Sequence, residues 1–383
     1  MKFVNVVVNW NQSTLIFYIA VILCSYFSAI LFRKVSLKGV IFSRKKSKFP
    51  LWLLITGLIL LFVKCFNTSG RDIRSGYYQN FLSATSFVNY RDNTVEIGFR
   101  LLQILIRHFT DNYAVFLFVV GLITLIPFLY VIDKYKNIID VPSVFLFYIC
   151  VYYFSGFSIA RISIAGAFSL LFFDALVEKK KLKALLFIML ACAFHITAVI
   201  LIVPYVFVLF KSLNKKMLVI GAIAVFAVVA ISRDSIFALM QGSERYYVYQ
   251  LSSSSSFGLE QIAYYIPLIV LYIFGRKKHP EITFGKNFDR ISISFISVGF
   301  AFGMLSYLIP IFGRLYSLFV TQTIISGYYI HNLKIMKSKA SYKILMINIL
   351  VLAYCFIRFG LYISQYYNLD DIMPYTNVFG WVI

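Results

Sequence analysis

Long apolar runs separated by short lysine-rich segments dominate the chain. A bilayer core takes roughly 20 apolar residues per helix, and most of the runs approach that length. They lie near residues 13–32, 49–66, 113–132, 142–156, 158–177, 217–231, 259–275, 289–308, 311–329 and 344–361. This pattern predicts an all-α polytopic integral membrane protein with about 11–13 transmembrane helices, in a single transmembrane domain over residues 1–383.

One further run, residues 184–210, has lysines at both ends, which predicts that both ends lie on the same side of the membrane. A single span does not satisfy that condition. We predict a hairpin of two short helices that turns near Ala193, Phe194 and His195 and brings His195 toward the non-cytoplasmic half of the membrane. Non-helical backbone at that depth needs protein or a water-filled cavity around it. The alternative is one long tilted helix.

Composition agrees with a membrane protein, because 61% of the residues are hydrophobic and 14% are charged. The net charge of +22 would suggest a nucleic-acid partner in a soluble protein. Here most cations lie in short segments between apolar runs, where they set topology, so no nucleic-acid partner is expected. The first run is long enough to span and precedes a basic segment, so we expect it to stay as a helix rather than to be cleaved.

The lysine-rich segments are predicted to face the cytoplasm by the positive-inside rule. They are residues 33–48, 133–140, 178–183, 211–216, 276–290 and 328–343. The outer side then receives two sizeable segments, 67–112 and 232–258, and a C-terminal tail. Within the first, residues 95–109 repeat apolar positions at helical spacing, which predicts an amphipathic helix along the membrane surface.

Lysine and arginine are distributed unequally between the two sides. The six predicted cytoplasmic segments hold 21 Lys and 4 Arg, and the other positions hold 10 Arg but only Lys2 and Lys64. Because the guanidinium group binds phosphate or carboxylate through two parallel hydrogen bonds, the outer face is a candidate anion site. The ten arginines are Arg71, Arg74, Arg91, Arg100, Arg107, Arg161, Arg233, Arg245, Arg314 and Arg358.

Two of these arginines, Arg161 and Arg314, lie inside apolar runs. A charge at the bilayer centre costs roughly 2.5–3.5 kcal/mol on insertion scales, so such residues usually face a cavity and have a function. The alternative is that both side chains extend to the outer headgroups. For Arg74, Arg91, Arg107, Arg233 and Arg358 we expect a solvent or headgroup contact.

Asp72, Glu96 and His195 are the candidate groups for proton transfer on the outer side. Each has a structural alternative. Asp72 and Glu96 are placed to be helix N-caps or first-turn acids, and His195 on an apolar segment is compatible with a core histidine. The sequence contains no GxSxG, P-loop, HExxH or dinucleotide-binding motif, so nucleotide-driven chemistry is unsupported.

Five short motifs follow one another in an order that resembles a known family. They are Gly70-Arg71-Asp72 with Tyr77, Glu96-x-Gly98, Arg161-x-Ser163-x-Ala165, Phe194-His195 and Pro374-Tyr375. Together they resemble the EpsG family of exopolysaccharide proteins, which is grouped with Wzy-type O-antigen and capsule polymerases. The resemblance covers most of the chain. The chain departs from the pattern at Ile162, where the family often has glutamine, so no role of that glutamine is carried over.

The resemblance implies a GT-C-type glycosyltransferase in the bacterial inner (cytoplasmic) membrane, with its active site facing outward. Its substrates would be repeat units carried on undecaprenyl pyrophosphate. Because such a donor is already activated, neither a nucleotide nor a metal cofactor is expected. Membrane lipid and a chain-length regulator protein are the further partners that this class implies.

The resemblance also assigns expected roles to residues. A leaving diphosphate needs fixed cations, and the acceptor hydroxyl needs a base. The expected base is Asp72, Glu96 or His195, and tyrosines at the rim are candidates for stacking on sugars. The expected contacts to diphosphate or sugar are Arg71, Arg100, Arg161, Arg245, Arg314, Tyr77 and Tyr316.

Two rival functions remain. An O-antigen ligase uses the same donor, but such ligases generally have a larger outer loop than either segment here. A flippase or transporter of lipid-linked oligosaccharide needs a path open alternately to both sides and often has internal repeats, and the sequence has no evident repeat.

Overall fold

The computed structural model describes most of the chain, and every structural statement below concerns that part. The described residues are 10–31, 36–38, 48–210, 220–221, 224, 227–228, 231–232, 256–275, 283–306, 310–336, 341–366 and 370–383. Most of the predicted span near 217–231 and nearly all of the predicted outer segment 232–258, including Arg245, lie outside the described residues.

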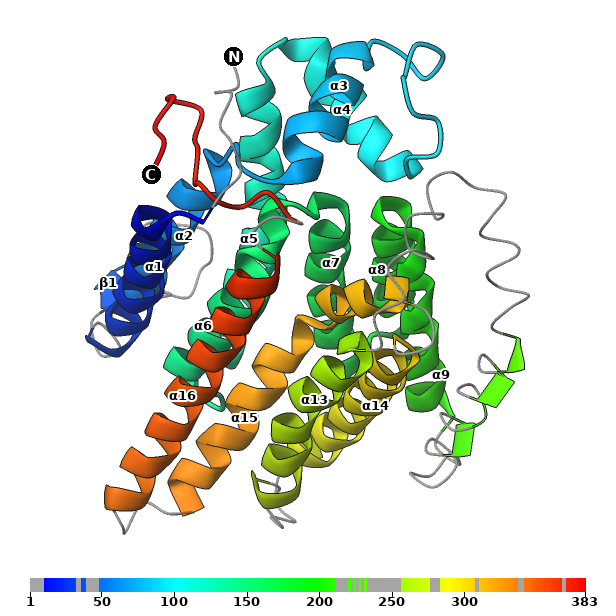
Figure 1. Cartoon of the computed structure of the whole chain (residues 1–383). Coiled ribbons are helices and arrows are strands. Elements are labelled where there is room, and N and C mark those ends of the chain that lie inside the picture. Colours follow the sequence, from blue (N-terminus) through cyan, green and yellow to red (C-terminus); the bar gives the residue numbers. More distant parts are fainter. Residues whose placement is uncertain are drawn as a thin grey trace.

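Helices make up nearly all of the described chain (Figure 1). The long helices are α1 (Gln12–Leu31), α2 (Leu51–Cys65), α5 (Tyr113–Tyr135), α7 (Ala160–Val177), α8 (Lys181–Phe194), α13 (Ser256–Gly275), α14 (Thr283–Leu305), α15 (Thr321–Met336) and α16 (Ser341–Tyr366). The shorter ones are η1 (Ile73–Tyr77), α3 (Tyr78–Ser83), α4 (Ile97–Phe109), α6 (Val141–Tyr148), η2 (Ile149–Tyr153), η3 (Ser155–Phe157), η4 (Ile196–Leu201), α9 (Ile202–Leu209) and η5 (Pro310–Phe319). Two three-residue strands, β1 (Ser36–Lys38) and β2 (Lys48–Pro50), pair antiparallel beside α2.

Several of these helices have the length and composition of membrane spans. Within the described residues, five reach both criteria: 12–31, 113–135, 160–177, 287–305 and 342–364. The outward faces of the spans are apolar, and on α16 the side chains of Leu345, Ile349 and Ile357 are each more than half exposed. Such faces suit contact with lipid, where helices satisfy their own backbone groups. The all-α, multi-pass fold class is therefore confirmed.

The chain reverses at His195, where the sequence predicts a hairpin. Helix α8 ends at Phe194, and His195 has extended backbone angles (φ −154°, ψ 113°) before η4 and α9 continue. The Tyr205 hydroxyl on α9 donates to the carbonyl of Lys181 at the start of α8, 3.4 Å away. Because α9 contacts the start of α8, the two helices run back alongside each other as a hairpin. The alternative prediction of one long tilted helix over residues 184–210 is therefore wrong.

Helices α3 and α4 lie across one end of the bundle, near the C-terminal segment (Figure 1). We call this end the α4 end. Helix α4 occupies residues 97–109 of the predicted 95–109 and buries Phe99, Gln103 and Ile106. Its first turn packs closely against the end of α8. A Cβ added to Gly98 would lie only 2.7 Å from the carbonyl oxygen of Ala193. This close approach brings the start of α4 next to the turn at His195.

The C-terminal segment braces the loop that leads into η1. The amides of Thr68 and Gly70 donate to the carbonyls of Thr376 and Asp371, both at 2.8 Å. Gly70 has φ +113°, and a Cβ there would overlap the Phe157 carbonyl, so this position of the Gly-Arg-Asp motif requires glycine.

Arg74 joins the same brace, contrary to the expected solvent or headgroup contact. Its Nε donates to the Thr68 carbonyl and its Nη2 to the Thr376 hydroxyl, both at 3.2 Å. This contact joins Arg74 to a residue about 300 positions later in the chain. The local sequence around Arg74 therefore does not predict it.

The predicted span over residues 311–329 is wrong in its boundaries. Residues 310–319 form the 3-10 helix η5, and the α-helix runs from Thr321 to Met336. The last turns of α15 carry polar residues that contact the rest of the protein: Asn332 is buried, and Lys334 Nζ lies 2.8 Å from Oδ2 of Asp140, the N-cap residue of α6. Hydropathy placed these residues in a cytoplasmic loop because it does not distinguish a polar residue in a helix interface from one in a loop.

Candidate active site

A partly buried ion pair between α7 and α4 forms the centre of the candidate site. Arg161 lies in the first turn of α7, and Glu96 is the N-cap residue of α4. Nη1 of Arg161 donates to Oε2 of Glu96 at 2.5 Å, with the side chains 12% and 14% exposed. The Glu96 side chain makes no capping hydrogen bond, so the alternative that Glu96 only caps its helix is wrong.

Tyr77 connects this ion pair to Asp72. The Nε of Arg161 donates to the Tyr77 hydroxyl at 3.3 Å, and that hydroxyl donates to Oδ2 of Asp72 at 3.3 Å. The guanidinium carbon also lies 5.7 Å from the centroid of the Tyr77 ring, within range of a cation–π interaction. Asp72, Tyr77 and Arg161 therefore form one continuous polar chain from η1 to α7.

Helix α4 fixes the position of Tyr77 through a buried glutamine. Nε2 of Gln103 donates to the Tyr77 carbonyl at 2.9 Å, and its Oε1 accepts a hydrogen bond from the hydroxyl of Tyr90. The Tyr77 ring packs against Phe99 with centroids 4.8 Å apart, and its side chain is almost fully buried. No face of the Tyr77 ring is open to a sugar, so Tyr77 does not have the expected role of stacking on one. Its hydrogen bond with Arg161 indicates instead that it orients the guanidinium.

His195 lies on the other side of Glu96. The amide of Ile196 approaches Oε1 of Glu96 at 3.5 Å, and the charges of Glu96 and His195 influence each other. The Nδ1 of His195 is 2.8 Å from the hydroxyl of Thr197. All three candidate proton-transfer groups therefore gather at the α4 end. We call Asp72, Tyr77, Glu96, Arg161 and His195 the Arg161 cluster.

The cluster holds Glu96 in its ionised form. Burial of the carboxyl group disfavours the charge, but the guanidinium of Arg161, a backbone hydrogen bond and the charge of His195 outweigh burial, so the pKa of Glu96 lies below its ordinary value of 4.5. Burial, and next the negative charge of Asp72, raise the pKa of Tyr77 to about 12. At neutral pH Glu96 is therefore a carboxylate, and Tyr77 is a neutral hydroxyl.

A pH dependence of stability follows from the lowered pKa of Glu96. A carboxyl whose pKa is lower in the folded state stabilises the fold above its unfolded pKa, and that stabilisation is lost as pH falls. We expect the melting temperature of the purified protein to drop as pH falls below about 4.5 and Glu96→Gln to remove part of this drop. Asp111→Asn is the control, because its carboxylate is 85% exposed and exposed pairs contribute little. Identical pH profiles for wild type and Glu96→Gln would contradict the ion pair with Arg161.

The other expected contact residues make different contacts or are not described. Arg100 places its guanidinium 5.5 Å from the Phe87 ring centroid and its Nη1 3.5 Å from Asn93. Arg71 is exposed, and its amide donates to the carbonyl of Asp370. Tyr316 packs against Tyr152 with ring centroids 5.9 Å apart. The side chain of Arg314 and the whole of Arg245 lie outside the described residues.

Two residues of this region had no role assigned from the sequence. Gln103 has no distinctive sequence environment, since it is one polar residue on an amphipathic helix. Lys64 did have a detectable feature, because it lies inside an apolar run as Arg161 does. In the structure its side chain is buried.

The protein is thus a multi-pass α-helical membrane protein with a partly buried, charged cluster at one end of its bundle. The model of the EpsG family matches residues 50–377, which is most of the chain, and the protein belongs to that family. The family is associated with polysaccharide polymerases. No curated protein and no solved structure matches the chain significantly. The matched range contains every member of the Arg161 cluster.

Proposed function

We propose that this protein is a GT-C-type glycosyltransferase that polymerises repeat units carried on undecaprenyl pyrophosphate at the outer face of the bacterial cytoplasmic membrane. The observation that carries the proposal is the Arg161 cluster, which combines a fixed cation with candidate proton acceptors at one end of a membrane bundle. Family membership supports a role in polysaccharide polymerisation. The lysine-rich segments are expected to face the cytoplasm, which leaves residues 67–112, and with them the α4 end, on the outer side of the membrane.

In the proposed reaction an acceptor sugar hydroxyl attacks the anomeric carbon of the donor glycan. A new glycosidic C–O bond forms, the C–O bond to the lipid diphosphate breaks, and the diphosphate leaves with the bonding electron pair. Arg161 would stabilise the charge that develops on this leaving group. A guanidinium has five N–H donors, and its contacts with Glu96 and Tyr77 use two of them. The contacts hold the guanidinium in one orientation and leave donors for phosphate oxygens.

The proton of the acceptor hydroxyl needs a base, and His195 is the group we propose. Glu96 is less suitable, because its lowered pKa makes it a weak base and it already pairs with Arg161. His195 lies beside Glu96 at the turn after α8, where the Ile196 amide approaches Oε1 of Glu96 at 3.5 Å. Asp72 is the second candidate, although the Tyr77 hydroxyl already donates to its carboxylate.

The length distribution of surface glycan in a deletion strain tests this function. Loss of a polymerase should leave glycan as single repeat units, because flipping and attachment remain intact. Loss of all surface glycan would instead indicate the flippase or the ligase. Complementation with the wild-type gene is the control and should restore the full ladder.

A further inference from the structure

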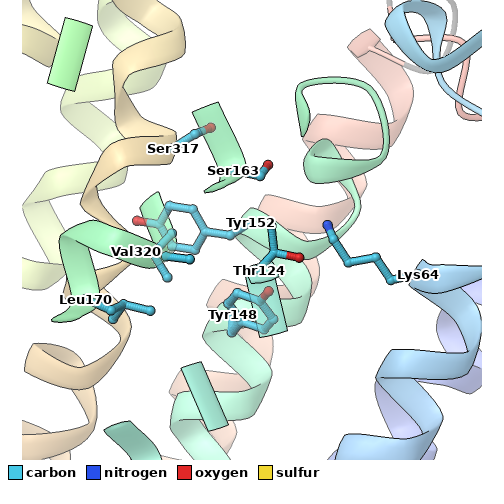
Figure 2. Close-up of a pocket in the computed structure, with 9 residues that line it drawn as sticks. Lys64, Thr124, Tyr148, Tyr152, Ser163, Leu170, Ser317 and Val320 are labelled. Carbon is cyan, nitrogen blue, oxygen red and sulfur yellow. The ribbon is translucent and has the colours of Figure 1, made fainter. Parts of the chain in front are cut away.

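An open groove lies at the α4 end, between the first turns of α5 and the C-terminal segment (Figure 1). Its volume is about 730 Å³, within the range of roughly 300–1,000 Å³ that is typical of ligand sites. A second cavity lies beside Lys64 and Tyr152 (Figure 2), and its volume of about 20 Å³ has room for one water molecule. Of these two cavities, only the groove can hold an organic ligand.

The walls of the groove are apolar. They are formed by Phe66 after α2, by Val115 and Phe118 on α5, and by Val378 and Phe379 in the C-terminal segment. The ring centroids of Phe66 and Phe118 lie 6.2 Å apart, and those of Phe66 and Phe379 lie 5.1 Å apart. A polar ligand would lose its hydrogen bonds to water against such walls, so the groove suits a hydrocarbon chain.

The groove extends to the depth of the lipid chains. Phe118 is six residues after Asn112, the N-cap residue of α5, which corresponds to roughly 9 Å along the helix axis. Helix α5 has the length and composition of a membrane span, so its first turns cross one boundary of the bilayer. A glycan would have to leave water to reach Phe118, whereas a hydrocarbon chain already lies at that depth.

The same apolar surface continues along α2 and α5 toward the middle of the bundle. Leu58 and Phe62 precede Phe66 at four-residue spacing, and both are exposed on α2. Ile126 is likewise exposed on α5, two turns after Phe118. The groove is therefore continuous with the lipid-facing surface of the spans, and a lipid chain can enter it from the bilayer.

A pair of opposite charges at the edge of the groove selects the headgroup. Asp111 lines the groove with a carboxylate that is 85% exposed, and it forms an ion pair with Arg107 in the last turn of α4. A carboxylate attracts an ammonium group and repels a diphosphate, and a guanidinium binds phosphate. A headgroup with both an ammonium and a phosphate matches both charges, whereas an anionic carrier lipid matches only Arg107.

We propose that the groove binds one acyl chain of an aminophospholipid, with the ammonium group at Asp111 and the phosphate at Arg107. This site does not rest on the proposed function, because its occupant is not the substrate. The amide of Val378 in the groove wall donates to the carbonyl of Phe66 at 2.9 Å, and the same C-terminal segment braces the loop before η1. A bound chain therefore packs against the segment that holds the Gly-Arg-Asp motif.

Trp381 provides an intrinsic reporter for this site. Its side chain is exposed, and its ring centroid lies 5.7 Å from that of Phe379 in the groove wall. The other two tryptophans of the sequence, Trp10 and Trp52, would be replaced by phenylalanine. The full chain would be reconstituted into phosphatidylcholine nanodiscs, because a quaternary ammonium cannot donate a hydrogen bond to Asp111. Trp381 fluorescence would then be titrated with phosphatidylethanolamine or phosphatidylglycerol that carries brominated acyl chains, since bromine quenches tryptophan on contact.

We expect quenching by brominated phosphatidylethanolamine to saturate at a mole fraction several-fold lower than quenching by phosphatidylglycerol. Val115→Phe should fill the groove and raise the half-saturating mole fraction of phosphatidylethanolamine about ten-fold. Asp111→Asn should remove the preference between the two lipids. Val270→Phe is the control, because Val270 is exposed on α13 and does not line the groove, and it should behave like the parent protein.

Quenching that rises in proportion to mole fraction and equally for both lipids would show contact with bulk lipid alone and would overturn the site. An unchanged half-saturating mole fraction in folded Val115→Phe would have the same meaning. Displacement of the brominated lipid by undecaprenyl phosphate would also overturn the proposal, because the groove would then bind the carrier lipid. If Val115→Phe does not fold, Asp111→Asn decides the matter, and a retained preference for phosphatidylethanolamine in that variant contradicts the proposed headgroup contact.

Discussion

Arg161→Lys should reduce the rate of polymerisation about ten- to a hundred-fold and shift surface glycan to short chains. The substitution keeps the positive charge, so insertion into the membrane should be unaffected. It removes the planar fork that contacts Glu96 and Tyr77 simultaneously, and lysine cannot reproduce that geometry. Loss of one charge-assisted hydrogen bond of roughly 1.5–3 kcal/mol in the transition state corresponds to the stated rate loss.

The measurement is the glycan ladder at matched protein levels in a complemented deletion strain. Arg91→Lys is the matched control, since Arg91 is exposed at the same end of the bundle, and its ladder should be normal. A normal ladder from Arg161→Lys would mean that this position supplies only charge, and that the leaving diphosphate binds elsewhere.

His195→Gln should have a still larger effect, a rate loss of about 10²–10⁴, the usual range for removal of a general base. Glutamine has a similar size and keeps one hydrogen-bond donor, so the turn between α8 and η4 should survive. It cannot take a proton near neutral pH. The loss should therefore appear in the turnover rate, with the affinity for the lipid-linked donor nearly unchanged.

The control for this substitution is His108→Gln, because His108 is exposed on α4. Turnover should be measured across pH, since removal of the base should also remove the acidic limb of the wild-type pH–rate profile. Wild-type turnover in His195→Gln would exclude His195 as the base, and Asp72→Asn would then be expected to abolish activity.

The sequence predicts the membrane class, most helices and the turn at His195 because each depends on local physics. Apolar runs of about 20 residues imply spans, and lysines at both ends of one run imply a reversal within it. The shift of α15 to Thr321–Met336 could not be predicted in this way. Its Lys334 pairs with Asp140, the N-cap residue of α6, and a single sequence does not show that pairing.

The candidate site was predicted as a set of residues, and its internal pairing came only from the structure. Glu96 and Arg161 are 65 residues apart, and no spacing rule connects them. The sequence analysis expected both Arg100 and Arg161 to contact diphosphate or sugar, but the loop before α4 folds back so that Arg100 meets Phe87 and Asn93. The difference arises from tertiary packing of a loop without periodicity.

Lys64 illustrates a different limit. One lysine near the end of an apolar run is commonly a helix-end residue that extends to the headgroups, and the sequence alone favours that interpretation. Burial against Gly156 and Phe157 depends on the turn between α6 and α7. The sequence predicts a break there between the runs 142–156 and 158–177, but it does not show that Lys64, 92 residues before Gly156, packs against it. Charge inside an apolar run is therefore informative at both Lys64 and Arg161.

An assay of polymerisation by the purified protein decides whether this chain is itself the polymerase. The protein would be reconstituted into liposomes with undecaprenyl-pyrophosphate-linked repeat units as the only substrate, and the products would be separated by length. We expect a ladder of lipid-linked products longer than one repeat, with release of undecaprenyl pyrophosphate, and a strongly shortened ladder from Arg161→Lys. Unextended single repeats from folded wild type, or their appearance on the opposite leaflet without extension, would contradict it.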